Sequence, residues 1–340
     1  MVTPHKPPRI KQAGADCNLE ETMFDLSRRR LMTGVLALGL SFAPVAASAD
    51  DFVNILTGGT SGVYYPLGVA ISKIVTDKVP GTRPSVQATK GSVENLNLIQ
   101  GGKGEIGFTL GDSLAAAVMG SADAGFKGPL DKVQTIGAIY PNYVQIVASE
   151  ESGIKSLADL KGKRVSVGAP KSGTELNARA ILSAAGMSYE DLGKVEYLDF
   201  AQSVELMKNR QLDATLQSAG LGVASIRDLA TSVPIVVVEV PTDIAQKLGQ
   251  PFFSATIPAN TYDGQAADVT TVAVPNFLVT RADLSDELVY NITKAIYENL
   301  PELQAAHAAA KGIKLENAAK GSPAPLHPGA LKYFTEKNVL

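Results

Sequence analysis

Cysteine, tryptophan and histidine are scarce in this chain of 340 residues, which contains one cysteine, no tryptophan and three histidines. The single cysteine, Cys17, lies in an N-terminal stretch that we expect to be removed from the mature protein. A mature chain without cysteine excludes disulfides, zinc sites built on thiolates, a cysteine nucleophile and a lipid anchor on an N-terminal cysteine. Packing alone must therefore stabilise the fold.

Residues for catalytic chemistry are also few. Beyond residue 49 only His307 and His327 remain, and neither belongs to a nucleophile or zinc motif, so a structural role is the simpler interpretation. Glu94 and Asp112 could form a carboxylate pair, but nothing in the sequence fixes their separation, and each also fits a capping role. We therefore predict a protein that is not an enzyme and that has no cofactor and no metal site.

The chain has no strong excess of charge of one sign. Removing the first 49 residues takes away six basic and four acidic residues from totals of 31 and 34, which leaves a net charge of −5. A mildly acidic surface without a basic run argues against nucleic acid and against an anionic membrane as partners.

No apolar run is long enough for a permanent membrane anchor. The basic block 28–30 precedes an apolar stretch over 31–45, whereas a spanning helix needs roughly 20 residues, and the small residues 47–49 follow. This pattern predicts a signal peptide over residues 1–49, cleaved near Ala49, and a periplasmic protein. Residues 27–31 resemble a twin-arginine signal. The general secretory route stays open, as does a start at Met1 or Met23.

From Phe52 onward, short apolar runs alternate with amphipathic stretches, which is typical of α/β layers around a mostly parallel sheet. The length after cleavage suits two lobes better than a single core. We expect lobe 1 to comprise 50–142 and 274–340, and lobe 2 to comprise 143–273, with the apolar run 271–280 returning the chain to lobe 1. Expected strands cover 52–56, 86–89, 106–110, 133–140, 144–149, 164–168, 214–217 and 235–240; expected helices cover 64–79, 91–100, 175–185, 203–210 and 284–300, the last capped by Ser285 or Asp283.

Three turns, at 57–62, 91–95 and 170–174, place small residues before a helix. A helix start has unpaired backbone N–H groups and the positive end of the dipole, so such a turn attracts an anion. Ordinary capping by the hydroxyls is the alternative for any one turn. Three turns from two lobes together predict a shared ligand cleft. The predicted ligand-binding residues are Thr60, Ser61, Tyr64, Ser92, Asn95, Asp112, Ser172, Gly173, Thr174, Asn177 and Gln217.

The first turn is not a nucleotide loop, because it lacks both the lysine and hydroxyl pair of a P-loop and the glycine spacing of a dinucleotide site. Tyr64 follows this turn in the first turn of the expected helix. It could line the cleft, although a packed tyrosine fits the same position.

Several stretches, in order along the chain, resemble the solute-binding proteins of tripartite ATP-independent periplasmic (TRAP) transporters, in the TAXI branch (TRAP-associated extracytoplasmic immunogenic). The most specific matches are Tyr-Tyr-Pro-Leu-Gly at 64–68 and His-Pro-Gly-Ala at 327–330. Further matches lie at 57–63, 91–95, 159–165, 172–174, 257–262 and 278–284, so the resemblance covers nearly all of the chain after residue 49.

This resemblance implies a two-lobed type II periplasmic-binding-protein fold and a partner permease driven by an ion gradient. It also implies a small carboxylate ligand such as glutamate, glutamine or 2-oxoglutarate, and we expect a monomer. Lys90 and Lys171 depart from the family pattern, and a cation there could favour a second carboxylate, although an exposed lysine explains them equally. A periplasmic ligand sensor that signals to a receptor is the alternative function.

Overall fold

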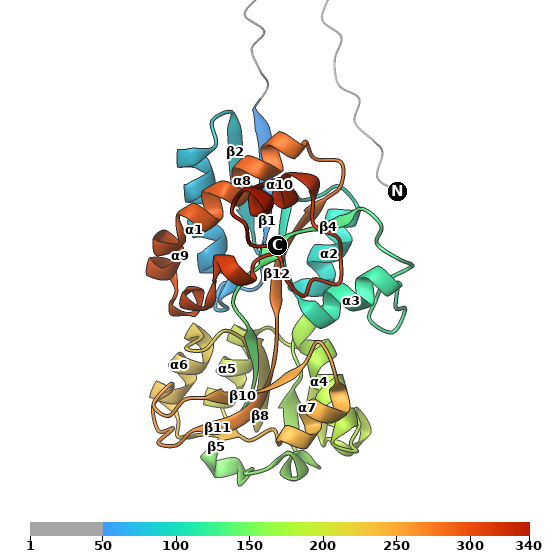
Figure 1. The fold of residues 1–340 in the computed structure, drawn as a ribbon. Coiled ribbons are helices and arrows are strands. Elements are labelled where there is room, and N and C mark those ends of the chain that lie inside the picture. The colour runs from blue at the N-terminus through green and yellow to red at the C-terminus, as the bar shows by residue number, and fades with distance from the viewer. Residues whose placement is uncertain (1–49) are drawn as a thin grey trace, which may run out of the picture. The chain divides into compact units, whose positions relative to one another are not determined.

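The computed structural model describes residues 50–340, which form two α/β lobes, each built on its own β-sheet (Figure 1). The predicted signal peptide lies outside the described residues. Lobe 1 contains β1 (Asp51–Leu56), α1 (Tyr64–Lys78), β2 (Thr82–Gln87), α2 (Ser92–Gln100), β3 (Ile106–Leu110), α3 (Gly111–Met119), β4 (Val133–Ala138), β12 (Asn276–Arg281), α8 (Asp286–Glu298), α9 (Leu300–Ala306) and α10 (Pro328–Glu336).

Lobe 2 is formed by the intervening part of the chain. It contains β5 (Asn142–Ser149), β6 (Arg164–Ser166), α4 (Gly173–Ala184), β7 (Lys194–Glu196), α5 (Phe200–Lys208), β8 (Ala214–Ala219), α6 (Ala224–Ser232), β9 (Ile235–Val238), α7 (Thr242–Leu248), β10 (Phe253–Ile257) and β11 (Val269–Val274).

The sheet of lobe 1 has five strands in the order β2-β1-β3-β12-β4, with β1 parallel to β2 and β3, and β12 antiparallel to both of its neighbours. The sheet of lobe 2 has seven strands. Six follow the order β10-β11-β5-β8-β6-β7, and β9 pairs with β5. The predicted α/β, two-lobed fold is confirmed.

The chain crosses between the two sheets twice. It leaves lobe 1 after β4 and enters β5, and it returns between β11 and β12. The apolar run 271–280, which the sequence suggested as one element, is two strands in different sheets separated by Pro275, because proline has no N–H to give to a sheet. Both crossings therefore lie close together in the sheets, at β5 and β11, whose ends pair through Tyr143 and Ala273.

Helix α1 shows why the predicted amphipathic stretches become helices. Leu67, Ile71, Ile74 and Val75 repeat at helical spacing and are buried. Gly68 lies on the same face, where a Cβ would stand 2.4 Å from Thr57 Cγ2, so glycine lets the helix pack closely on β1. Helix α8 is equally regular and begins at Ser285, whose side chain accepts a hydrogen bond from the Leu288 N–H, one of the two predicted caps.

Several elements differ from the sequence-based expectation, and two of them, β2 and α3, show the physical reason. Strand β2 begins at Thr82 and ends at Gln87, whereas the sequence predicted 86–89. It is an edge strand with only partly buried side chains, so it has no strong apolar run, and it tolerates Pro84. Helix α3 follows β3 directly at Gly111 and was not predicted, because no loop separates the two elements.

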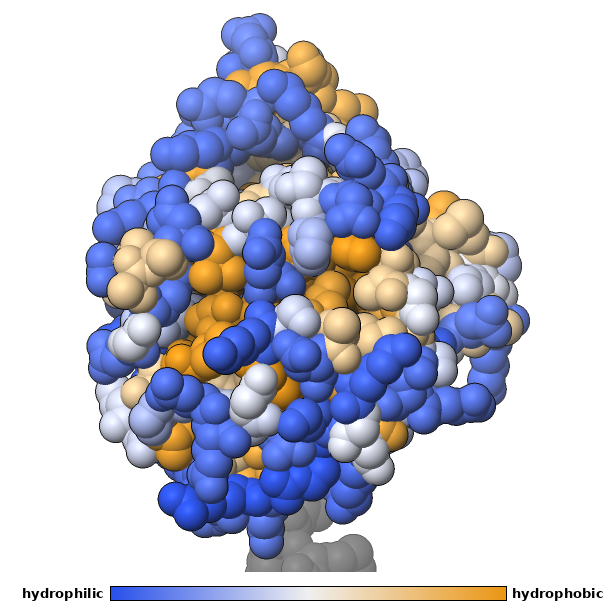
Figure 2. Space-filling view, turned by 90° about the horizontal axis from the view of Figure 1, so that it is seen from below, coloured by the Kyte–Doolittle hydropathy of each residue, from blue (hydrophilic) through white to orange (hydrophobic). Residues whose placement is uncertain are grey.

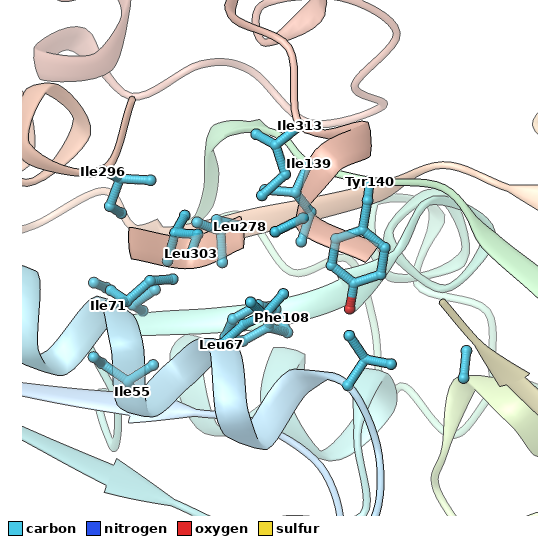
Figure 3. Packing of buried hydrophobic residues seen from close by; sticks show 14 of the residues in the cluster. Ile55, Leu67, Ile71, Phe108, Ile139, Tyr140, Leu278, Ile296, Leu303 and Ile313 are labelled. Atoms are coloured by element: carbon cyan, nitrogen blue, oxygen red, sulfur yellow. The ribbon is translucent and has the colours of Figure 1, made fainter. Parts of the chain in front are cut away.

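The largest hydrophobic cluster is continuous from lobe 1 into lobe 2. It packs the helices α1 and α8 on the first sheet, and it includes Tyr140 at the crossing, Ala219 of β8 and residues of α5 and α6. Figure 3 shows Tyr140 next to Ile139, with its hydroxyl directed away from Ile313. Two further clusters lie within lobe 2 and within lobe 1. The segment that crosses between the lobes at Tyr140 is therefore part of a hydrophobic core and is not an exposed linker.

Seen from below, hydrophilic residues cover most of the surface, and hydrophobic residues show between them near the centre of this face (Figure 2). None of the helices within residues 50–340 is both long enough and apolar enough to cross a membrane.

Candidate ligand-binding site

A cavity of about 570 Å³ lies where loops of lobe 1 and lobe 2 meet. The loops after β1, β2, β6 and β7 reach it, and these four strands belong to the parallel parts of the two sheets. Ligands of open α/β sheets bind beyond the carboxyl ends of such strands. The lining residues are Gly58, Gly59, Thr60, Gly62, Val63, Tyr64, Ala88, Thr89, Lys90, Gly91, Ser92, Leu110, Tyr140, Asn142, Ala169, Pro170, Ser172, Gly173, Thr174, Tyr197, Asp199, Phe200, Gln202, Ser218 and Ala219.

The structure brings the three predicted turns together at this cavity. Of the predicted site residues, those that line it are Thr60, Tyr64, Ser92, Ser172, Gly173 and Thr174. Those that do not line it are Ser61, Asn95, Asp112, Asn177 and Gln217.

Hydroxyl groups at the starts of α2 and α4 each accept a hydrogen bond from the backbone. Ser172 accepts from the Glu175 N–H at 3.1 Å, and Ser92 accepts from the Leu110 N–H at 3.1 Å. The capping interpretation is therefore correct for Ser172. A hydroxyl that accepts in this way keeps its own O–H to donate, so both groups can still bind an acceptor in the cavity.

The two helix starts come from different lobes and touch each other. The Glu94 N–H donates to the Lys171 carbonyl at 3.1 Å. A Cβ on Gly173 would stand 2.5 Å from Leu110 Cδ1 and 2.6 Å from Ser92 Oγ, both in lobe 1. Only glycine fits at position 173 while the lobes are this close, and two positive helix ends then face the same cavity.

Asn95 and Gln217 stabilise the loops from behind. Both are fully buried. The Asn95 amide donates to the Thr57 carbonyl at 2.7 Å and to the Phe108 carbonyl at 2.8 Å, which ties the first turn to β3. Gln217 accepts a hydrogen bond from the Ser225 hydroxyl at 2.6 Å. These side chains position the walls of the cavity.

Asp112 and Asn177 form a polar contact between the lobes. The Asn177 amide donates to Asp112 Oδ2 at 2.7 Å. Asp112 is partly exposed as a residue, but its Oδ1 atom is buried and has no hydrogen-bond partner. Burial raises the pKa of this carboxyl to about 7. Nearby, Arg179 donates to the Asp123 carbonyl at 2.9 Å across the same flank.

Tyr64 packs in the core and also lines the cavity, so both roles considered for this tyrosine in the sequence are present. Its ring stacks on Phe108 with centroids 4.9 Å apart, and its hydroxyl donates to Asn276 Oδ1 at 2.6 Å. Burial raises the pKa of this phenol above its ordinary range. Ser61 acts through its backbone, since its carbonyl accepts from the Ser225 N–H at 3.4 Å, between the lobes.

Several lining residues were not predicted. Tyr140 and Asn142 lie at the crossing, both almost fully buried, and in the sequence they look like core residues. The Tyr140 hydroxyl and the Asn142 Oδ1 have no hydrogen-bond partner within residues 50–340. Phe200 begins α5 after a capping box of Asp199 and Gln202, a motif that could have indicated a fourth helix start at the cavity.

Both late histidines cap helix starts. Nδ1 of His327 accepts from the Gly329 N–H, and Nδ1 of His307 accepts from the Ala309 N–H, each at 3.1 Å. Burial lowers the pKa of both imidazoles. Residues 50–340 contain no group of three or more His, Cys, Asp or Glu side chains that could hold a metal ion.

The fold is that of the two-lobed periplasmic binding proteins. The periplasmic binding protein BugD superposes with a TM-score of 0.54 and 12% identity, over 85% of this chain and 94% of that one. A structure from Bordetella bronchiseptica RB50 gives a TM-score of 0.53 and 20% identity, over 85% and 83% of the two chains. Residues 55–337 match the model of the NMT1-like family. The chain belongs to the NMT1-like family.

Proposed function

We propose that this protein is an extracytoplasmic solute-binding protein of a transport system, and that it captures a small carboxylate in the cavity between its lobes. The main support is that α2 and α4, from different lobes, both begin at this cavity with hydroxyl donors still available. A carboxylate between them would accept hydrogen bonds from both lobes and face two positive helix ends.

The cavity size supports a small ligand. A volume of about 570 Å³ lies within the range of small-molecule pockets, roughly 300–1,000 Å³. Among the lining residues within 50–340, only Lys90 and Asp199 carry a formal charge. The carboxylate charge would therefore be balanced mainly by helix ends and hydroxyls, with Lys90 at an exposed position.

The transporter class is part of the proposal. The motifs at 64–68 and 327–330 resemble the TAXI branch of TRAP transporters, and this resemblance supports a membrane permease as partner and glutamate, glutamine or 2-oxoglutarate as candidate ligands. The export signal over 1–49 supports a periplasmic location. The lobe limits at 142/143 and 273/274 are proposed as the points about which two rigid bodies rotate.

Titration calorimetry of the protein without residues 1–49 against L-glutamate, L-glutamine and 2-oxoglutarate tests this function. At least one compound should bind at one site without chemical conversion, and should raise the free energy of unfolding by about 2.7 kcal/mol at a hundredfold excess over Kd. A protein that binds none of the three, or that converts one to a product, would contradict the proposal.

A further inference from the structure

A chain of hydrogen bonds leads from the contact between the lobes to the wall of the cavity. The Ser218 hydroxyl donates to Asn177 Oδ1 at 2.7 Å, and the Asn177 amide nitrogen donates to Asp112 Oδ2 at 2.7 Å. Asp112 belongs to lobe 1, whereas Asn177 and Ser218 belong to lobe 2. Asn177 is fully buried, and Ser218 lines the cavity.

When Asp112 is ionised, chemistry fixes the direction of each bond in this chain. An ionised carboxylate can only accept, so Asp112 must face the NH₂ group of Asn177 and not its oxygen. The Asn177 oxygen is then directed at Ser218 and takes the single proton of that hydroxyl. What remains of the Ser218 hydroxyl is its lone pairs, so it can accept a hydrogen bond from a ligand but cannot donate one.

A second acceptor lies next to Ser218. The Asn142 amide nitrogen donates to the Ser218 carbonyl at 3.1 Å, which leaves Asn142 Oδ1 buried without a partner on the cavity wall. The opposite polarity holds at the helix starts, where Ser92 and Ser172 keep their protons to donate. The cavity thus presents donors for an anion at Ser92 and Ser172 and acceptors for N–H groups at Ser218 and Asn142.

We infer that Asp112 is a positioning residue that acts through Asn177 to keep Ser218 a hydrogen-bond acceptor, so that the closed cavity selects carboxylates that also present an N–H donor. The inference rests on the proposed function and narrows its ligand class. An ammonium group would satisfy Ser218 and Asn142, whereas a keto oxygen at the same place would face two acceptors. Asp199 on the cavity lining adds a negative charge that favours the same ligands.

L-glutamate and 2-oxoglutarate are matched probes, because they differ only in an ammonium group against a keto oxygen on one carbon. The measured quantity is the ratio of their Kd values by calorimetry at pH 8, where Asp112 is ionised. We expect the protein to prefer L-glutamate by about 10- to 100-fold, the size of a charge-assisted hydrogen bond. A variant that lowers the stability of the protein weakens the binding of both ligands equally, so it leaves the ratio of the two Kd values unchanged.

Two variants should reduce the preference. Ser218→Ala removes the acceptor, and Asn177→Leu frees the Ser218 proton to donate to a keto group; each should lower the ratio at least about fivefold. The double variant Asp112→Asn with Asn177→Asp exchanges the two side chains. An amide at 112 then donates to a carboxylate at 177, which still takes the Ser218 proton, so the ratio should return to that of the unchanged protein.

Asn97→Leu, on the exposed face of α2, is the matched control for the asparagine change and should leave the ratio unaltered. If both probes bind but the ratio is near one, or is the same in Asn177→Leu and Ser218→Ala as in the unchanged protein, the inference is wrong and the proposed function stands. If neither probe binds, the inference is overturned; binding of L-glutamine, which also carries a carboxylate, would then retain the proposed function, and binding of none of the three would overturn both.

Discussion

The two flanks of the contact between the lobes are built differently. On the flank of α3 and α4 the lobes meet through directional hydrogen bonds, with Asp112 bound to Asn177 and the Glu94 N–H bound to the Lys171 carbonyl. On the flank of α1, α5 and α6 mostly small and apolar groups meet, as where Phe200 lies 3.7 Å from the Cβ position of Gly62, and a long hydrogen bond of 3.4 Å joins the Ser225 N–H to the Ser61 carbonyl. The first flank, with its shorter hydrogen bonds, therefore constrains the relative position of the lobes more strongly than the second, where most contacts are apolar.

Each flank also has a glycine with no room for a Cβ between the lobes. Gly173 faces Leu110 and Ser92 on the polar flank, and Gly220 faces Ala309 on the apolar flank, where a Cβ would stand 2.6 Å from the Ala309 Cβ. We therefore expect an added methyl group to weaken closure more on the flank of α3 and α4, because its short hydrogen bonds require one relative position of the lobes.

The largest effect is expected for Gly173→Ala. The added methyl group would overlap Leu110 Cδ1 and Ser92 Oγ across the lobes, and overpacking of this kind costs about 1–3 kcal/mol, or roughly 5- to 150-fold in Kd. Calorimetry measures the loss. Because the overlap exists only when the lobes are closed, the melting temperature without ligand should not fall. Gly128→Ala is the control, since its Cβ meets nothing within 4 Å. An unchanged Kd would mean that the ligand-bound lobes do not close as described.

The second effect is a pH dependence confined to the polar flank. In the closed form burial raises the pKa of Asp112 to about 7, and we expect an open form that exposes this carboxyl to have the ordinary value of 3.8, so closure should take up a proton. This contribution to closure is complete below the lower pKa and is lost as the pH rises through the higher one. Ligand affinity should therefore fall about tenfold from about pH 6 to about pH 8.

Asp112→Asn sharpens this measurement, because an amide cannot titrate and should remove the slope. Asp123, Arg179 and Glu190 line the outer pocket that also contains Asp112, so their charges face the same flank. A slope that persists in Asp112→Asn would show that the titrating group is not Asp112 and would overturn this prediction.

The smallest effect is expected for Gly220→Ala. The new methyl group would press on Ala309, which is partly buried in the short 3₁₀ helix Ala308–Gly312 and can shift outward, and would stand 3.0 Å from the buried Tyr140 ring, which must move by a few tenths of an ångström. We expect a loss of affinity below about tenfold. A loss of affinity equal to that of Gly173→Ala would show that the two flanks resist added volume equally, and the proposed difference between them would be wrong.

The sequence predicted the parts of the fold that depend on local pattern. Apolar periodicity located α1 and α8, a buried apolar run located β3, and the small residues at 91–95 and 170–174 located two helix starts at the cavity. It did not predict α3 or the start of β2, because one has no loop before it and the other is an edge strand with few buried side chains.

The unpredicted site residues share a different cause. Tyr140, Asn142 and Ser218 reach the cavity only because two crossing strands and β8 lie side by side, which is a long-range arrangement. Asp112 and Asn177 were predicted to touch the ligand, but the structure places them behind the wall, in contact with each other. The polar residue types at 112 and 177 indicated a place near the site, but the spacing in the sequence could not show that these two side chains bind each other.

The position of β12 between β3 and β4 sets an order on the synthesis of the chain. These two strands have no hydrogen-bonded partner on their facing edges until residues 276–281 exist, although both are made more than 130 residues earlier. All strands of lobe 2 are made in the meantime. A ribosome-bound chain would therefore hold a completed second sheet beside an unfinished first one, whose open edges could pair with another chain. Threading the chain through the membrane unfolded would avoid this hazard, whereas export after folding would require every residue through β12 to be in place first.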